Sequence, residues 1–154
     1  MKTINIELAV ADYFGYRKNI AVPNVSWGMG FNHELDVLIV SMDGYCTEIE
    51  IKISVSDLKA DFKKKHGHKD DRIRRLFYAV PEKMKDITLK LVPEHAGVLI
   101  CKEGAFRDFV ECIRGCGINK TAKKLTEKEM INIGRLGCMR IWNLKSQIIK
   151  SNKK

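Results

Sequence analysis

The chain has 154 residues and carries 28 Lys and Arg against 19 Asp and Glu, a net charge of +9. This length fits one domain around one hydrophobic core. Hydrophobic residues at 45% and charged residues at 31% indicate a globular protein and exclude a fibrous or disordered one. No apolar run approaches the roughly 18 residues of a membrane helix, and Met1–Glu7 does not resemble a signal peptide. We therefore expect a cytoplasmic protein that does not enter a membrane.

The positive charge is unevenly distributed along the chain. Residues 1–113 carry 17 basic and 17 acidic side chains, whereas residues 114–154 carry 11 basic and 2 acidic ones. Within the neutral part, Glu34–Glu50 holds five acids and no base, and Lys59–Arg75 holds eight bases. A cation site beside a polyanion-binding track needs such an order. Solvated surface charge is the alternative interpretation.

The first half of the chain predicts a helix, three strands and a second helix. The spacing of apolar residues places them at about 3–16, 19–26, 35–41, 47–54 and 57–66. Thr3 and Ser56 are the predicted N-cap residues of the two helices. Asp43-Gly44, between the second and third strands, predicts a hairpin turn.

The second half predicts a strand, a short helix, a strand pair and a long helix. These lie at about 75–80, 84–91, 97–101 with 106–113, and 126–149, the last opened by a Thr126–Glu129 capping box. The order predicts an α/β fold with a mixed central sheet flanked by helices. Residues 1–113 would form its αβββαβ core. Residues 114–154 would be a basic C-terminal extension of the same domain, with its long helix packed on the core.

Three residues on the second and third predicted strands form a candidate site for a divalent cation and a phosphate. Asp36 interrupts an otherwise apolar run, where an ionised carboxylate is costly unless a cation or several donors meet it; the alternative is a solvated strand start. Glu50 and Lys52 are two residues apart and so share one face of a strand. Paired carboxylates can hold a hard divalent cation, and a nearby lysine can orient water or stabilise charge on a phosphate.

In this arrangement the sequence resembles the PD-(D/E)XK nuclease superfamily, whose core has the order αβββαβ. Asp36, Glu50 and Lys52 match its motif, although no proline precedes Asp36. The closer likeness is to small phage and bacterial members, including the MmcB-like DNA-repair proteins. It rests on Val22–Gly28, Glu48–Ser54, Asp61–Lys69 and Phe77–Pro81, and it covers residues 1 to about 101.

The resemblance implies a restriction-endonuclease-like fold and hydrolysis of DNA by a metal-activated water. Asp36, Glu50 and the carbonyl of Ile51 would hold Mg²⁺ or Mn²⁺, and Lys52 would contact the attacking water. Glu7 is the acid on the first helix that could join them, unless it is a solvated helix residue. The function could be DNA repair or phage DNA processing. A DNA-binding protein that keeps the fold without cutting is the main alternative, and a basic RNA-binding protein is the third.

The hairpin signal conflicts with this site. A two-residue turn closed by Met42 and Tyr45 would set Asp36 opposite Ile51, away from the face of Glu50. A shared site therefore predicts an odd-length loop or a bulge, so that paired residue numbers sum to 86 or 88.

Basic residues after the site strand predict contacts to DNA phosphates, or else a solvated helix end. They are Lys63, Lys64, Lys65, His68, Lys69 and Arg72, with Lys123 and Lys124 from the extension. We expect DNA as the partner and no small-molecule substrate, and leave a homodimer open. The five cysteines, including Cys112 and Cys116, match no zinc or cluster spacing and predict free thiols.

Overall fold

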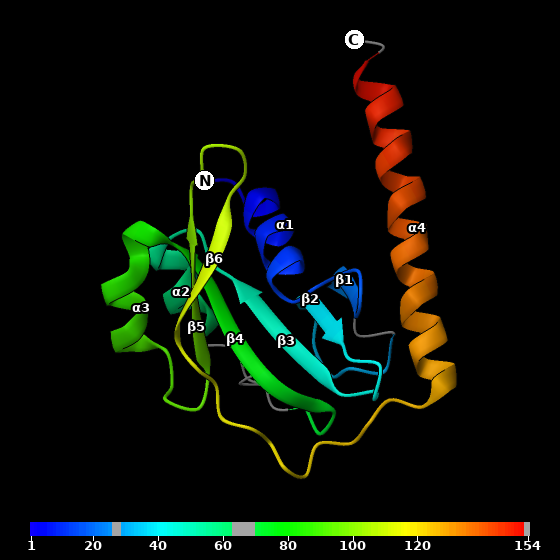
Figure 1. Cartoon of the computed structure of the whole chain (residues 1–154), viewed down its shortest axis with the longest axis horizontal. Helices are drawn as coiled ribbons and strands as arrows, with labels where there is room; N and C mark the ends of the chain where they lie inside the picture. Colours follow the sequence, from blue (N-terminus) through cyan, green and yellow to red (C-terminus); the bar gives the residue numbers. More distant parts are fainter. Residues whose placement is uncertain (26–28, 63–69, 153–154) are drawn as a thin grey trace.

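The computed structural model describes residues 1–25, 29–62 and 70–152. Six strands form one mixed sheet in the order β1-β2-β3-β4-β5-β6, flanked by helices (Figure 1). The predicted α/β class and mixed sheet are therefore confirmed. The elements are α1 (Thr3–Tyr13), β1 (Ile20–Val25), β2 (Leu35–Val40), β3 (Cys46–Ile51), α2 (Val55–Asp61), β4 (Ile73–Pro81), a 3₁₀ turn (Glu82–Met84), α3 (Lys85–Leu91), β5 (Gly97–Lys102), β6 (Phe109–Arg114) and α4 (Glu127–Ser151).

The sheet combines antiparallel and parallel pairs. β1, β2 and β3 are antiparallel neighbours, β3, β4 and β5 are parallel, and β6 returns antiparallel to β5. Parallel neighbours need crossover connections, which α2 supplies between β3 and β4 and α3 supplies between β4 and β5. β6 begins at Phe109, three residues later than predicted, because residues 103–108 are taken up by the connection after β5.

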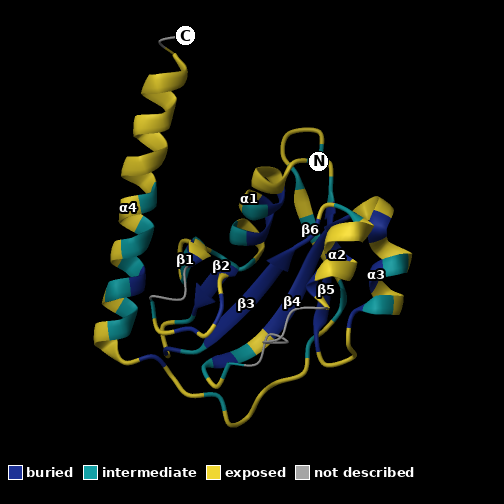
Figure 2. Ribbon diagram, turned by 180° about the vertical axis from the view of Figure 1, so that it is seen from behind, coloured by how far each residue is buried: buried dark blue, intermediate teal, exposed yellow. Residues whose placement is uncertain are grey.

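The two faces of the sheet are covered differently. Ile6 and Val10 of α1 pack against Ile49 and Ile51 of β3 in one apolar cluster. Since side chains alternate along a strand, the glutamates of β3 project to the opposite face, where α2 lies. All six residues of β3 are buried, and the strand is coloured as buried along its length in Figure 2. The predicted alternation is confirmed, but its polar face is inside the protein.

The β2–β3 hairpin closes through a three-residue loop, residues 42–44. The Ser41 N–H donates to the Tyr45 carbonyl at 3.0 Å. Gly44 has a φ of 84°, a left-handed conformation that glycine adopts without strain. The odd-length loop that the shared site requires is thus confirmed, and a two-residue turn at Asp43-Gly44 is not formed.

Two predicted helix caps are wrong. α1 already includes Thr3, so its N-cap is Lys2, which makes no side-chain cap. α2 starts earlier than predicted because Ser54, in an extended conformation, accepts a hydrogen bond from the Asp57 N–H at 3.2 Å. Ser56 therefore lies within the first turn of the helix.

The long helix α4 begins at the predicted capping box of Thr126 and Glu129. Its first half packs on β1, with Ile133 buried in the cluster that includes Val22. Its second half extends beyond the sheet and is exposed (Figure 2). Within the described part of the chain, no helix combines the length and the apolar character needed to cross a membrane.

The Gly44 loop can be tested by substitution. A Cβ at Gly44 would lie 2.8 Å from the Leu125 carbonyl oxygen, in addition to the cost of a left-handed backbone. We expect Gly44→Ala to lower the free energy of unfolding by about 2 kcal/mol, measured by urea denaturation. Gly134→Ala is the matched control, because a Cβ there meets nothing within 4 Å and helix propensity favours alanine. Equal destabilisation of both variants would contradict this role of Gly44.

Candidate functional site

Glu50 and Lys52 form a buried ion pair at the C-terminal end of β3. Lys52 Nζ donates to Glu50 Oε2 at 2.6 Å, and the two residues are 4% and 1% exposed. The main-chain N–H of Lys52 donates to the Ala79 carbonyl at 3.1 Å, which holds the residue against β4 just beyond the end of β3. The acid-x-Lys pattern is therefore an interior feature of the sheet.

β2 brings Asp36 to this pair. The paired residue numbers of β2 and β3 sum to 86, and this register, if continued, sets Asp36 opposite Glu50. Asp36 Oδ2 accepts a hydrogen bond from the Ile51 N–H at 2.8 Å and lies 3.6 Å from Lys52 Nζ. The structure thus brings together the three residues of the predicted motif, with the main chain of Ile51 beside them.

A third carboxylate, that of Asp61, completes the surroundings of Lys52. Asp61 is the last residue of α2, and its Oδ1 lies 3.3 Å from Lys52 Nζ. Tyr78, which pairs with Glu50 in the β3–β4 register, donates its hydroxyl to Asp61 Oδ2 at 3.0 Å. The sequence-based prediction missed both residues. The available signal was the spacing of Asp61, three residues after Leu58 on the buried side of α2.

The electrostatics of this cluster keep Lys52 charged. Burial lowers the pKa of Lys52, but the carboxylates of Glu50, Asp36 and Asp61 outweigh this effect and hold the pKa above its ordinary value. Burial raises the pKa of the Tyr78 hydroxyl, and the charge of Asp61 raises it further. At neutral pH Lys52 is therefore an ammonium, and Tyr78 is a neutral hydrogen-bond donor.

Glu7 of α1 lies close enough to Asp36 to sense its charge. Burial raises the pKa of Glu7, and the negative charge of Asp36 raises it further. Glu7 is therefore within electrostatic range of Asp36, and its role in the site stays a prediction. Asp36 is the member of the motif that solvent reaches, since its side chain is 37% exposed.

A cleft of about 620 Å³ opens beside Glu7 between α1, β1 and α4. Asn24 lines it and lies between Pro23 and Val25, which pair with Val37 and Leu35 of β2, the neighbours of Asp36. Arg140 of α4 donates from Nη2 to the Asn24 carbonyl and also lines the cleft. This cleft therefore lies between the basic C-terminal extension and Glu7, the residue of α1 whose pKa senses the charge of Asp36.

A second buried contact, between a histidine and a carboxylate, adjoins the site on the same face of β3. His33 Nε2 and Glu48 Oε1 are 2.7 Å apart, and Glu48 is fully buried. Glu48 precedes Glu50 by two residues and also raises the pKa of Tyr78. The sequence-based prediction missed this pair, although the isoleucine alternation of β3 already placed Glu48 in phase with Glu50.

The residues present fit a two-carboxylate site for a divalent cation. Mg²⁺ keeps several waters and needs only one or two carboxylates from the protein. Asp36 and Glu50 supply these hard oxygen ligands, and the Asp36 side chain is 37% exposed, so solvent can reach it. In residues 1–25, 29–62 and 70–152, no three His, Cys, Asp or Glu side chains form a ready-made metal cage. Coordination by the Ile51 carbonyl stays a prediction.

The predicted phosphate-binding residues divide into two groups. Lys63, Lys64, Lys65, His68 and Lys69 lie outside the described residues. Arg72 pairs with Glu129 at 2.7 Å, Lys123 pairs with Asp71, and the Lys124 ammonium lies 4.8 Å from the centre of the Tyr45 ring. The latter three are near the start of β3, at the opposite end of the strand from Lys52. The structure does not bring them to the site.

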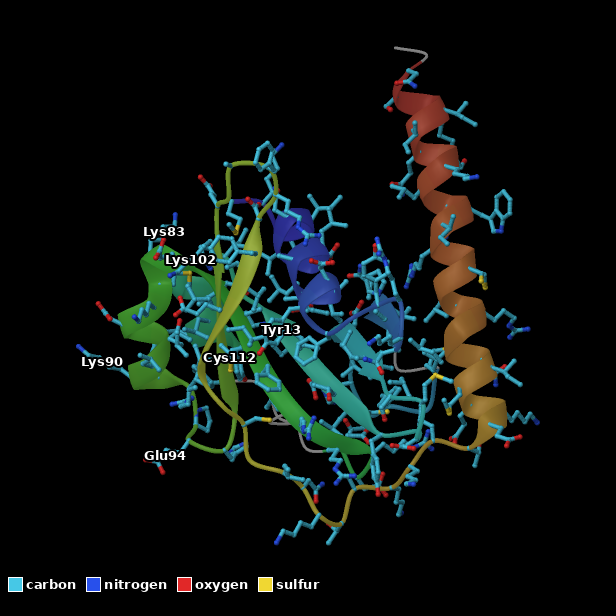
Figure 3. All side chains as sticks on the ribbon, viewed as in Figure 1. Tyr13, Lys83, Lys90, Glu94, Lys102 and Cys112 are labelled. Atoms are coloured by element: carbon cyan, nitrogen blue, oxygen red, sulfur yellow. The ribbon has the colours of Figure 1, made fainter. Side chains whose placement is uncertain are left out.

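The cysteines are free thiols, as predicted. Cys46 and Cys101 are buried, and burial raises the pKa of each thiol to about 12. Cys112 on β6 lies near Tyr13 of α1 on the surface of the molecule (Figure 3). These positions are separate from the carboxylate site.

Replacing Lys52 tests how far the cluster depends on its charge. We expect Lys52→Met to lower the free energy of unfolding by about 3 kcal/mol or more, because three carboxylates lose a shared buried cation. Urea denaturation measures the loss, and added Mg²⁺ should recover part of it. Lys59→Met on the exposed side of α2 is the control and should have little effect. Similar stabilities of the two variants would show that the cluster does not need the ammonium.

The raised pKa of Glu7 makes a prediction about pH. Its ionised form is less favourable in the folded chain than in the unfolded one, so Glu7 lowers stability above its unfolded pKa and not below it. We expect Glu7→Gln to raise Tm at about pH 7 and to leave it unchanged at about pH 3. Exposed Glu94→Gln should change Tm at neither pH. A lower Tm of Glu7→Gln at neutral pH would be inconsistent with this placement.

Comparisons with known proteins identify the family and a similar fold. The sequence matches the family described as DNA repair protein MmcB-like over residues 2–147. No curated protein matches it. The fold is similar to that of a solved structure, the SPO1766 protein of unknown function from Silicibacter pomeroyi, with 19% identity, a TM-score of 0.64 and coverage of 99% of this chain and 94% of that chain. Because the family match spans nearly the whole sequence, the chain belongs to the MmcB-like family of DNA repair proteins.

Proposed function

We propose that this protein is a divalent-metal-dependent DNA nuclease with a restriction-endonuclease-like core. One observation carries the proposal: the three-residue hairpin loop sets Asp36 and Glu50 in register, and both lie within 3.6 Å of Lys52 Nζ. The order of α1, β1, β2, β3, α2 and β4 agrees with the αβββαβ core that the resemblance implies. Membership of a DNA-repair family supports DNA as the substrate.

In this proposal Asp36 and Glu50 hold Mg²⁺ or Mn²⁺, with the Ile51 carbonyl as a third ligand. When bound, the cation lowers the pKa of a water molecule and neutralises charge on the scissile phosphate. Lys52 keeps its proton at neutral pH, since the surrounding carboxylates raise its pKa. Lys52 therefore orients the attacking water and stabilises phosphate charge, and does not act as the general base.

The exposed side of Asp36 gives the direction from which DNA would approach. The cleft between α1, β1 and α4 is lined by Arg140 and by Glu7, whose pKa senses the charge of Asp36. From residue 130 to residue 152, α4 and its cap carry four bases and no acid, namely Arg135, Arg140, Lys145 and Lys150. Attraction between this helix and phosphates would hold DNA along the cleft.

A DNA-binding protein without catalysis is the second candidate. It is favoured by the tight pair of Lys52 and Glu50, which balances the Glu50 charge without a metal. The net charge of +9 favours sequence-independent attraction to DNA. The two candidates differ in whether a phosphodiester bond is broken.

A cleavage assay with matched variants separates them. Supercoiled, linear and single-stranded DNA are incubated with the protein and Mg²⁺, Mn²⁺ or EDTA. We expect metal-dependent cleavage that Glu50→Gln and Lys52→Ala reduce by about a hundredfold or more, because each removes charge stabilisation at the reacting phosphate. Glu94→Gln is the control, since Glu94 lies at the turn after α3, away from the site (Figure 3).

Metal binding should also appear without any substrate. Mn²⁺ should raise Tm of the unmodified protein and not that of Glu50→Gln, because a ligand that binds only the folded state stabilises it. Salt-dependent DNA binding without cleavage under any metal, and without this shift in Tm, would refute the nuclease and establish the non-catalytic alternative.

A further inference from the structure

Asp61 is a buried carboxylate at the site that stands outside the Asp36, Glu50 and Lys52 motif. It is 1% exposed, and both of its oxygens are engaged by groups from other elements. Oδ1 lies 3.3 Å from the Lys52 ammonium, and Oδ2 accepts the Tyr78 hydroxyl at 3.0 Å. The side chain is therefore fixed at two points, one at the end of β3 and one on β4.

Docking of α2 on the sheet does not by itself require a carboxylate here. Leu58 already anchors the helix in the apolar cluster on this face, and an amide could accept the Tyr78 hydroxyl equally well. A buried carboxylate costs far more free energy than a buried amide unless a cation compensates it. The Lys52 ammonium, 3.3 Å from Asp61 Oδ1, supplies such a cation.

The three carboxylates around Lys52 differ in whether they would also bind the metal. Of the three carboxylates around Lys52, Glu50 at 2.6 Å and Asp36 at 3.6 Å are the two proposed metal ligands. A divalent cation on these two groups would compete with the ammonium for their charge and repel it. Asp61 is not one of the proposed metal ligands, and its other oxygen accepts the Tyr78 hydroxyl. The metal would therefore not compete with the ammonium for Asp61.

We propose that Asp61 is a positioning residue that keeps the Lys52 ammonium in the site when Asp36 and Glu50 bind the metal. Without metal, Lys52 is held mainly by Glu50. With metal, the contact with Asp61 retains it, and the Tyr78 hydroxyl keeps Asp61 in place. This role rests on the proposed metal-dependent function and assigns Asp61 and Tyr78 a part in it that is neither metal binding nor proton transfer.

The experiment follows the Lys52 ammonium directly. Proton–nitrogen NMR of the lysine side chains reports how fast the ammonium protons exchange with water, and the Lys52 signal is assigned by its loss in Lys52→Arg. The full-length chain is compared with Asp61→Asn, with and without Mg²⁺. Asp57→Asn, the same change at an exposed position of α2, is the matched control. Calorimetry measures Mg²⁺ binding to each protein, and single-turnover cleavage gives the rate of the chemical step.

We expect the Lys52 signal of the unmodified protein to persist with and without Mg²⁺. In Asp61→Asn it should persist without Mg²⁺, and exchange should become about tenfold faster or more when Mg²⁺ binds, as expected for losing a buried ion pair. Mg²⁺ affinity should change little, whereas the cleavage rate should fall by up to about a hundredfold, because a catalytic group is displaced. Asp57→Asn should behave like the unmodified protein.

Two results would overturn the inference while leaving the nuclease in place. One is an Asp61→Asn protein that binds Mg²⁺ and keeps a protected Lys52 signal. The other is a Lys52 signal that is lost to the same extent with and without Mg²⁺, which would make Asp61 a permanent structural anchor. Failure of the unmodified protein to bind Mg²⁺ would instead refute the proposed function, and the inference with it. If Asp61→Asn does not fold, Tyr78→Phe provides the same comparison, with a smaller Mg²⁺-dependent loss expected.

Discussion

The ion pairs of Lys52 are the constraint on which the rest of the site depends. Its ammonium lies 2.6 Å from Glu50, 3.3 Å from Asp61 and 3.6 Å from Asp36, three carboxylates that come from β3, α2 and β2. Charged groups inside a protein are costly unless they compensate one another, so these elements must meet with defined geometry. The interaction therefore holds the end of the β2–β3 hairpin and the end of α2 at one point, and this point is the candidate site.

The two faces of β3 separate these charges from the apolar core. Ile49 and Ile51 supply β3 with an apolar face that packs on α1, while Glu48 and Glu50 lie on the opposite face, each with a buried partner. The apolar face supplies the burial that stabilises the strand, and the polar face carries the chemistry. α1 serves both purposes, because it covers the apolar face and still brings Glu7 near Asp36 of β2. Glu7 also lines the cleft beside α4.

Much of the site could be predicted because it depends on short spacings. Glu50 and Lys52 share a face through the period of a strand, and the requirement that Asp36 join them predicted an odd-length loop. Asp61 and Tyr78 were missed because no local spacing connects them; the parallel register of β3 with β4 and the packing of α2 bring them together. Ser54, and not Ser56, caps α2 because β3 ends early enough for an extended residue at position 54.

By itself, the sequence determined the α/β class, the order of elements, the acid-x-Lys pair and the need for an odd number of residues in the β2–β3 loop. It could do so because strand and helix periods are local properties of the chain. Only the tertiary structure decided that the polar face of β3 is buried, that Asp61 is the third neighbour of Lys52, and that Arg72, Lys123 and Lys124 lie at the other end of the strand. Contacts between residues far apart in sequence depend on strand pairing and on the angle at which helices pack. The charge of +9 could therefore be read from composition, but its place relative to the site could not.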